Sequence, residues 1–200
     1  LMIFYSMPDI LWHPMKNEFQ KNQNEDMELK QLEEKVMLLD KAGSDVIAIC
    51  SNTTNKLADQ LDSTLHEKLI NLIDATRDHL LQRGVFRVGL LGTRYTMELD
   101  FYKNKLNEKG VQVVVPDKAD RELLHCIIYE ELCKGRITSH AQEAVLNIID
   151  KLATSNELDG VILGCTELPL LVSKTDVNIP LFDTIDIHID AILKKMTHLN

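Results

Sequence analysis

Short apolar runs alternate with longer amphipathic stretches along most of the chain. Strands are expected at six runs rich in Val and Ile, namely residues 2–5, 45–50, 86–91, 111–115, 159–163 and 179–182. The longer stretches carry apolar residues at helical spacing and predict helices at residues 26–41, 56–62, 65–82, 98–108, 121–134, 139–153 and 186–196. Strands that alternate with helices predict an α/β fold with parallel sheets flanked by helices.

The same alternation predicts two similar lobes, with a break near Gly84. The first lobe would hold residues 1–84 together with 183–200, and the second would hold residues 85–182. Each lobe contains one buried strand followed by a small polar loop, in DVIAICSNT (45–53) and DGVILGCTE (159–167). We expect these two loops to face a shared cleft between the lobes, because ligands bind beyond the carboxyl ends of parallel strands.

Both loops carry small polar side chains directly before a predicted helix. A helix N-terminus offers free N–H groups that suit a carboxylate, although Ser, Asn and Thr at such positions also serve simply as helix caps. Two such loops in matching places favour a binding site. The candidate residues are Ser51, Asn52, Thr53 and Thr54 in the first loop, and Cys165, Thr166 and Glu167 in the second.

Cys165 is the sharpest single candidate. A thiol at a helix N-terminus has a lowered pKa and can act as a base or nucleophile near neutral pH. The alternative is a small buried apolar residue, which is the usual state of a cysteine without a disulfide. We expect that alternative for Cys126 and Cys133, which lie in the amphipathic stretch 121–134.

A third polar turn, Thr93 to Thr96, follows the strand predicted at residues 86–91. Arg94 and Thr93 are placed there to bind an acidic ligand, or Arg94 is a solvated surface charge. The glycines of this segment do not follow the GxGxxG spacing of dinucleotide sites. The seven histidines show no metal-ligand spacing, and of these only His188 follows a strand end closely. We therefore expect no cofactor and no metal.

Charge and composition exclude several classes of protein. Lys and Arg number 22 against 31 Asp and Glu, a net charge of −9, which argues against a nucleic-acid binder. No apolar run approaches the roughly 18 residues of a transmembrane helix, and residues 1–6 are too short for a signal peptide. The four cysteines form no CxxC pair, which fits a reduced, cytoplasmic protein.

At these loops the sequence resembles the aspartate/glutamate racemase family. Residues 160–171, GVILGCTELPLL, resemble its second cysteine motif, and residues 49–55, ICSNTTN, are similar to its first motif, normally Cys-Asn-Thr-x-His. Residues 88–97 resemble the segment that links the two motifs, and residues 180–184 and 187–188 resemble the closing strand and helix. The similarity runs from about residue 3 to residue 191.

The resemblance implies an isomerase that racemises an acidic amino acid without a cofactor such as pyridoxal phosphate. Members of the family use two facing groups, ordinarily thiols, of which one removes the α-proton and the other returns a proton to the opposite face. Here the resemblance implies Cys165 as the thiol base and Ser51 in the opposing position. It places Asn52, Thr53 and Thr166 around the substrate carboxylate, and it also implies a homodimer.

Three departures from the family pattern bear on activity. Ser51 replaces the first cysteine, and a hydroxyl is a much poorer acid–base, so activity is expected to be slow or one-sided. Asn55 replaces the histidine of the first motif. The family usually begins with a further strand and a Gly-rich loop before the segment matching residues 3–6, and we expect this sequence to lack them.

Two other readings stay open. One is a one-thiol relative of the arylmalonate decarboxylase type, which keeps only the second cysteine. The other is a catalytically impaired homologue that binds amino acids without turnover. Glu167 after Cys-Thr favours the aspartate/glutamate branch over the glutamate-only branch, which usually has His there.

Overall fold

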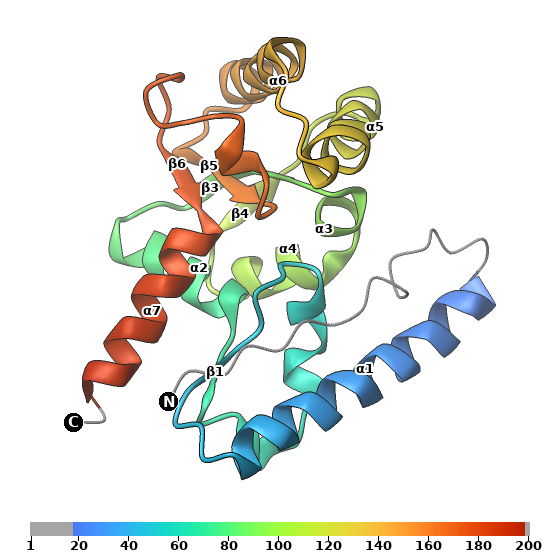
Figure 1. Ribbon diagram of the computed structural model, residues 1–200. Coiled ribbons are helices and arrows are strands. Elements are labelled where there is room, and N and C mark those ends of the chain that lie inside the picture. The colour runs from blue at the N-terminus through green and yellow to red at the C-terminus, as the bar shows by residue number, and fades with distance from the viewer. Residues whose placement is uncertain (1–17, 199–200) are drawn as a thin grey trace.

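The computed structural model describes residues 18–198, with side chains from residue 25 onward, and the expected α/β class with parallel sheets is confirmed (Figure 1). A two-stranded sheet pairs β1 (Ile47–Ala48) with β2 (Leu69–Ile70). A four-stranded sheet has the order β4-β3-β5-β6, and all its pairs are parallel. Its strands are β3 (Arg87–Gly92), β4 (Gln112–Val114), β5 (Gly160–Gly164) and β6 (Leu181–Asp183). The strand expected at residues 2–5 lies outside the described residues.

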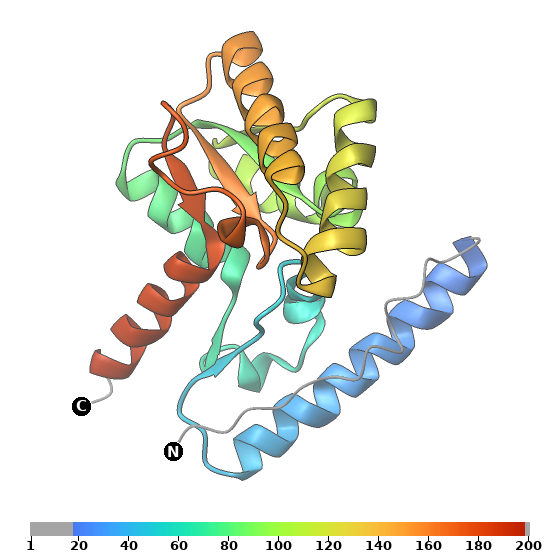
Figure 2. The same ribbon diagram turned by 45° about the horizontal axis from the view of Figure 1, so that its top comes forward.

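Helices flank both sheets. In Figures 1 and 2, α1 and α7 lie on opposite sides of the two-stranded sheet, while α5 and α6 lie together over the four-stranded one. The α-helices are α1 (Glu18–Lys41), α2 (Leu72–Gln82), α3 (Arg94–Glu98), α4 (Asp100–Asn107), α5 (Lys118–Cys126), α6 (Ser139–Asn156) and α7 (Thr184–His198). Short turns of 3-10 helix are η2 (Thr54–Gln60), η3 (Ser63–Leu65), η5 (Leu132–Lys134) and η6 (Leu168–Leu170), and η4 (Ile127–Glu131) is a π-helical turn.

The four-stranded sheet is buried on both faces, because side chains alternate between two hydrophobic clusters. Val161 and Leu163 of β5 point into the cluster formed with α5 and α6, whereas Ile162 between them points into the cluster formed with α2, α4 and α7. Strand β6 divides in the same way, with Leu181 on the first side and Phe182 on the second. The same alternation directs Cys165 toward the α5 and α6 side, where it joins the first cluster.

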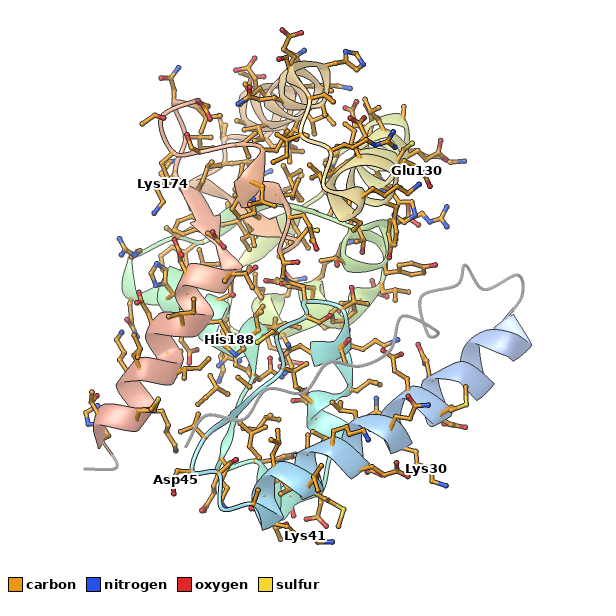
Figure 3. The ribbon with its side chains drawn as sticks, viewed as in Figure 1. Lys30, Lys41, Asp45, Glu130, Lys174 and His188 are labelled. Carbon is orange, nitrogen blue, oxygen red and sulfur yellow. The ribbon has the colours of Figure 1, made fainter. Side chains whose placement is uncertain are left out.

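The two-stranded sheet has a separate small core. Leu32 and Val36 of α1 pack with Ile47 and with residues from η2 and η3. Helix α7 connects this part to the larger sheet, because the buried His188 ring Nε2 lies 2.8 Å from the Ile70 carbonyl oxygen of β2 (Figure 3). The division of the chain into lobes at residue 84 stays a prediction.

The helix expected at residues 65–82 is wrong in its first part, since α2 begins only at Leu72. The side-chain oxygen of Asn71 accepts hydrogen bonds from the N–H groups of Ile73 (2.9 Å) and Asp74 (3.3 Å). An Asn cap of this kind satisfies donors that have no partner in the first turn and so sets where a helix starts. The residues just before it form strand β2, which the sequence reading missed.

Two other predicted helices differ in their bounds. The helix expected at 98–108 is α4 (Asp100–Asn107), and the extended Leu99 (φ −76°, ψ 147°) separates it from the short α3, which the sequence pattern did not predict. The stretch 121–134 becomes α5, the π-turn η4 and the 3-10 turn η5, ending at Gly135 with φ +70°. Cys126 and Cys133 are exposed rather than buried, since Leu124, Ile127, Ile128 and Leu132 occupy the buried side.

None of the helices within residues 18–198 combines the length and the apolar character needed to cross a membrane.

Candidate active site

The carboxyl ends of β3 and β5 meet at two glycines. Gly92 and Gly164 are register partners, and Thr96 of α3 packs against both. A Cβ on Gly92 would lie 2.8 Å from the Gly164 carbonyl oxygen, and a Cβ on Gly164 would lie 2.8 Å from the Leu91 carbonyl oxygen. Glycine at both positions therefore lets the loops after the two strands lie close together.

The first loop is shaped by its own polar side chains. Ser51 Oγ accepts a hydrogen bond from the Thr54 N–H at 3.2 Å. The fully buried Asn55 amide donates to the carbonyls of Ile49 (2.7 Å) and Ser51 (2.8 Å), and its oxygen accepts from the Leu72 N–H (3.0 Å). Asn55 thus holds the loop in shape and joins it to α2.

Two sets of hydrogen bonds bring the first loop to the ends of the larger sheet. Asn52 Nδ2 donates to Thr184 Oγ1 at 3.0 Å, and the Thr184 hydroxyl donates to the Leu163 carbonyl at 2.9 Å. The Thr53 and Thr96 hydroxyls lie 3.4 Å apart, and those of Thr96 and Thr93 lie 3.2 Å apart. Asn52 is only 4% exposed, yet its Oδ1 has no hydrogen-bond partner.

The second loop pairs a thiol with a carboxylate. Cys165 Sγ donates to Glu167 Oε2 at 2.9 Å, and Thr166 Oγ1 donates to the same oxygen at 2.6 Å. Cys165 is 6% exposed, and burial, followed by the hydrogen bond and charge of Glu167, raises the pKa of its thiol well above the usual value.

The expectation of a lowered thiol pKa at Cys165 is therefore wrong for this state of the protein. The following helical segment, η6, is a single 3-10 turn, too short to place a useful positive partial charge near the sulfur. The carboxylate lies beside the sulfur and favours the neutral thiol. Cys165 is held protonated, with a proton acceptor in contact.

Two aromatic residues of α5 and η4, His125 and Tyr129, were not predicted as site residues. The rings of His125 and Tyr129 are 4.6 Å apart, and the Tyr95 ring lies 6.1 Å from that of His125. The Arg94 N–H donates to His125 Nδ1 at 3.3 Å. Burial raises the pKa of Tyr129 to about 12, with smaller contributions from neighbours that include Cys165. The signal in the sequence was the spacing of His125 and Tyr129, which lie four residues apart on one face of a predicted helix.

The structure thus brings the predicted residues together in two groups. Asn52, Thr53 and Thr93 meet through Thr96 and Thr184, while Cys165, Thr166 and Glu167 contact one another. Thr54 is buried and serves the loop through its main chain, and the Arg94 side chain is exposed. That Ser51 and Cys165 face each other across a substrate stays a prediction.

Other features of the described residues lie apart from these loops. A cavity of about 680 Å³ lies along β6 and the start of α7, and none of the nine predicted residues lines it. His188 is buried and bonded to the Ile70 carbonyl, and burial lowers its pKa. Within the part of the chain that the structure describes, no group of three His, Cys, Asp or Glu side chains is arranged to hold a metal ion.

Comparison with known families decides the assignment. The model of the Asp/Glu/hydantoin racemase family matches residues 12–192, nearly the whole chain. The chain belongs to this family. The resemblance that the cysteine motifs indicated is thereby confirmed, and the polar loops described above are the segments that carry those motifs.

Solved structures agree with the family assignment. The chain is 39% identical to a candidate Asp/Glu racemase from Yersinia pestis, with a TM-score of 0.81 over 92% of this chain and 79% of that one. An aspartate racemase homologue from Pyrococcus horikoshii OT3 is 34% identical, with a TM-score of 0.81 over 98% and 83% of the two chains.

A curated glutamate racemase from Exiguobacterium sibiricum is 31% identical over 129 residues, which are 63% of this chain and 45% of that protein. The chain therefore matches less than half the length of that racemase.

Proposed function

We propose that this member of the family interconverts the enantiomers of aspartate or glutamate without a cofactor, with Cys165 carrying the proton on one face of Cα. The observation that carries the proposal is the contact between the buried Cys165 thiol and the Glu167 carboxylate. A cysteine removes a proton from carbon effectively only as the thiolate, so a site of this kind needs a group that takes the thiol proton when substrate is present. Glu167 lies where such a group is needed.

In the proposed reaction Glu167 accepts the proton of Cys165, and the thiolate removes the α-hydrogen. Thr166 donates to the same oxygen of Glu167 and so holds the carboxylate beside the sulfur. Ser51 occupies the opposing position by motif match, and we propose that it stands on the face where a proton is returned. Because a hydroxyl is a poor acid–base, we expect exchange that is slow or biased toward one enantiomer.

Asn52 and the threonines offer complementary groups to an amino acid. Asn52 Nδ2 is already engaged by Thr184, whereas its buried Oδ1 is unpartnered and suits the substrate ammonium group. We propose that the hydroxyls of Thr53 and Thr96 donate to the substrate α-carboxylate, where negative charge develops as the α-proton leaves.

Deuterium incorporation followed by NMR tests this function. The wild-type protein is incubated in D₂O with D- and L-aspartate and D- and L-glutamate in turn, and we expect loss of the Cα–H signal for at least one pair. Titration calorimetry with the same amino acids is run in parallel. Binding without exchange would reject the reaction and favour an amino-acid-binding protein.

A second candidate is favoured by Ser51 itself. If Cys165 is the single effective proton carrier, the site suits one-sided protonation of a carbanion left by loss of CO₂, as in a one-thiol decarboxylase. Release of CO₂ from a disubstituted malonate, with no amino-acid exchange, would support this alternative. The homodimer stays a prediction, which light scattering of the purified protein tests.

A further inference from the structure

We propose that Arg94, His125 and Tyr129 form the subsite that receives the side-chain carboxylate of the acidic substrate. This inference rests on the proposed function, and it assigns to the same site the residues that distinguish an acidic amino acid from others. His125 and Tyr129 come from α5 and the π-turn η4, outside the sequence motifs, and Arg94 begins α3.

His125 and Tyr129 share one helix face, and Tyr129 lies near enough to Cys165 for their charges to interact. They lie four residues apart, their rings are 4.6 Å apart, and both are half-buried. Tyr129 packs against the hydrophobic cluster that contains Cys165. It lies on a π-helical turn, an irregularity that is frequently found at functional sites.

The three side chains present hydrogen-bond donors. The main-chain N–H of Arg94 occupies His125 Nδ1, so in the neutral imidazole the proton lies on Nε2, which becomes a donor. Burial, then the nearby Arg94 charge, lowers the pKa of His125 and favours this neutral form. The Tyr129 hydroxyl and the Arg94 guanidinium add further donors, and a set of donors with one fixed cation is suited to a carboxylate.

Acidic neighbours do not cancel this character. Glu98 also faces His125, but its carboxylate is 3.0 Å from Arg121 Nε and is paired with it. Glu167 and Cys165 face Tyr129, together with Tyr95 and Cys133. Glu167 Oε2 already accepts hydrogen bonds from Cys165 and Thr166.

The proposed subsite and the threonine cluster both lie near the loop of Cys165. Gly164, the residue before Cys165, lies against Thr96, and Tyr129 lies in the cluster with Cys165 itself. A dicarboxylic amino acid would place its α-carboxylate at the threonines and its second carboxylate at Arg94, His125 and Tyr129. Cα would then lie near the thiol.

Protection of Cys165 from iodoacetamide tests the subsite without requiring turnover. Alkylation of the Cys165 peptide is followed by mass spectrometry in the presence of glutarate or of butyrate, which has the same apolar length but one carboxylate. The proteins compared are wild type, Tyr129→Phe, His125→Phe and the control Tyr102→Phe, which removes a tyrosine hydroxyl buried in the other cluster. Exchange kinetics with glutamate are measured on the same proteins.

We expect glutarate to protect the wild-type thiol at a lower concentration than butyrate. Tyr129→Phe and His125→Phe should each weaken glutarate protection about tenfold, the usual cost of losing one hydrogen bond to a charged group. Butyrate protection should be unchanged, and Tyr102→Phe should behave as wild type. In the deuterium-exchange assay with glutamate, Tyr129→Phe should raise KM about tenfold and leave kcat nearly unchanged, because it removes a binding contact remote from Cα.

Equal glutarate protection in wild type and in both variants would overturn the subsite, even if wild-type exchange is observed. Conversely, a wild-type protein that shows no exchange, while Tyr129→Phe still loses protection by glutarate, would reject the proposed reaction and support the subsite.

Discussion

The loop after β1 and the loop after β5 look alike in sequence but differ in how they hold their candidate catalytic residue, Ser51 or Cys165. Ser51 is half-exposed, and its oxygen accepts a hydrogen bond from the local Thr54 N–H, as a helix cap does. Cys165 is almost fully buried, and its thiol donates a hydrogen bond to the Glu167 carboxylate two residues away. One loop is organised to keep its own backbone in shape, and the other to hold a proton beside an acceptor.

This difference separates two requirements of a two-sided proton transfer. In the loop of Ser51, three hydrogen bonds of the buried Asn55 amide hold the backbone in a fixed position. In the proposed function the loop of Cys165 supplies the proton-transfer group, a thiol whose pKa depends on its burial and on Glu167. If the proposed function is right, the two faces of the substrate meet unequal partners, and the inequality should be measurable.

The largest effect is expected from Cys165→Ala. Removing the thiol should lower α-hydrogen exchange by about 10²- to 10⁴-fold, the usual contribution of a positioned acid–base group. Circular dichroism should show an unchanged fold. The matched control is Cys126→Ala, because Cys126 is exposed and lies outside the motifs. Exchange at the wild-type rate in Cys165→Ala would show that the thiol does not carry the proton.

A large loss of stability is expected from Asn55→Ala. The change removes the acceptor of the buried Leu72 N–H and one of the two donors to the Ile49 carbonyl, which still accepts from the Ser51 N–H, and it should lower the free energy of unfolding by about 2 kcal/mol. Urea denaturation measures it, and Asn178→Ala at an exposed position should cost less than about 0.5 kcal/mol. Similar midpoints for the two variants would contradict an anchoring role for Asn55.

An intermediate effect is expected from Glu167→Gln, which should speed alkylation of Cys165 but slow α-hydrogen exchange. The carboxylate raises the pKa of Cys165, so its removal should lower that pKa and make alkylation by iodoacetamide faster at a fixed, mildly alkaline pH. Exchange should nevertheless fall about tenfold or more, because the acceptor of the thiol proton is lost.

The pH profile of alkylation gives the same comparison. In wild type the rate should rise with pH without a plateau near neutrality, and in Glu167→Gln the whole curve should shift to lower pH. A shift to higher pH, or faster exchange in the variant, would contradict the proposed role of Glu167.

The smallest effect is expected from Ser51→Cys. A thiol at the opposing position should raise exchange several-fold and reduce the difference between enantiomers, since thiols are better acid–bases than hydroxyls at neutral pH. NMR with each enantiomer in D₂O measures both quantities, and Ser173→Cys, in an exposed loop, is the control. An unchanged rate and preference would place Ser51 away from the substrate.

The pattern of strands and helices predicted the α/β class, because Val- and Ile-rich runs such as residues 159–163 carry their signal locally. It failed at the bounds of elements. The side-chain cap of Asn71 moved the start of α2, and the extended backbone of Leu99 set the start of α4 and separated it from α3. Caps and breaks of this kind depend on side-chain geometry that periodicity does not contain.

At the candidate site, the motifs predicted which loop residues come together but not the protonation of Cys165. The raised thiol pKa of Cys165 comes from its burial against α5 and α6 and from the geometry of Glu167, which a motif does not encode. His125 and Tyr129 were missed because their position relative to the candidate loops depends on how α5 and η4 pack in the fold. Residues that reach a site through tertiary packing, and not through a local motif, could not be predicted from one sequence.

Thr184 sits at a junction that ties three segments of the chain. Its hydroxyl accepts a hydrogen bond from Asn52 and donates one to the Leu163 carbonyl of β5, so it acts as acceptor and donor at once. The spacing between the Ser51 loop and the Cys165 loop is thereby fixed by two short bonds at the first residue of the last helix. Any swing of that helix would be transmitted directly to the gap in which the substrate is proposed to sit.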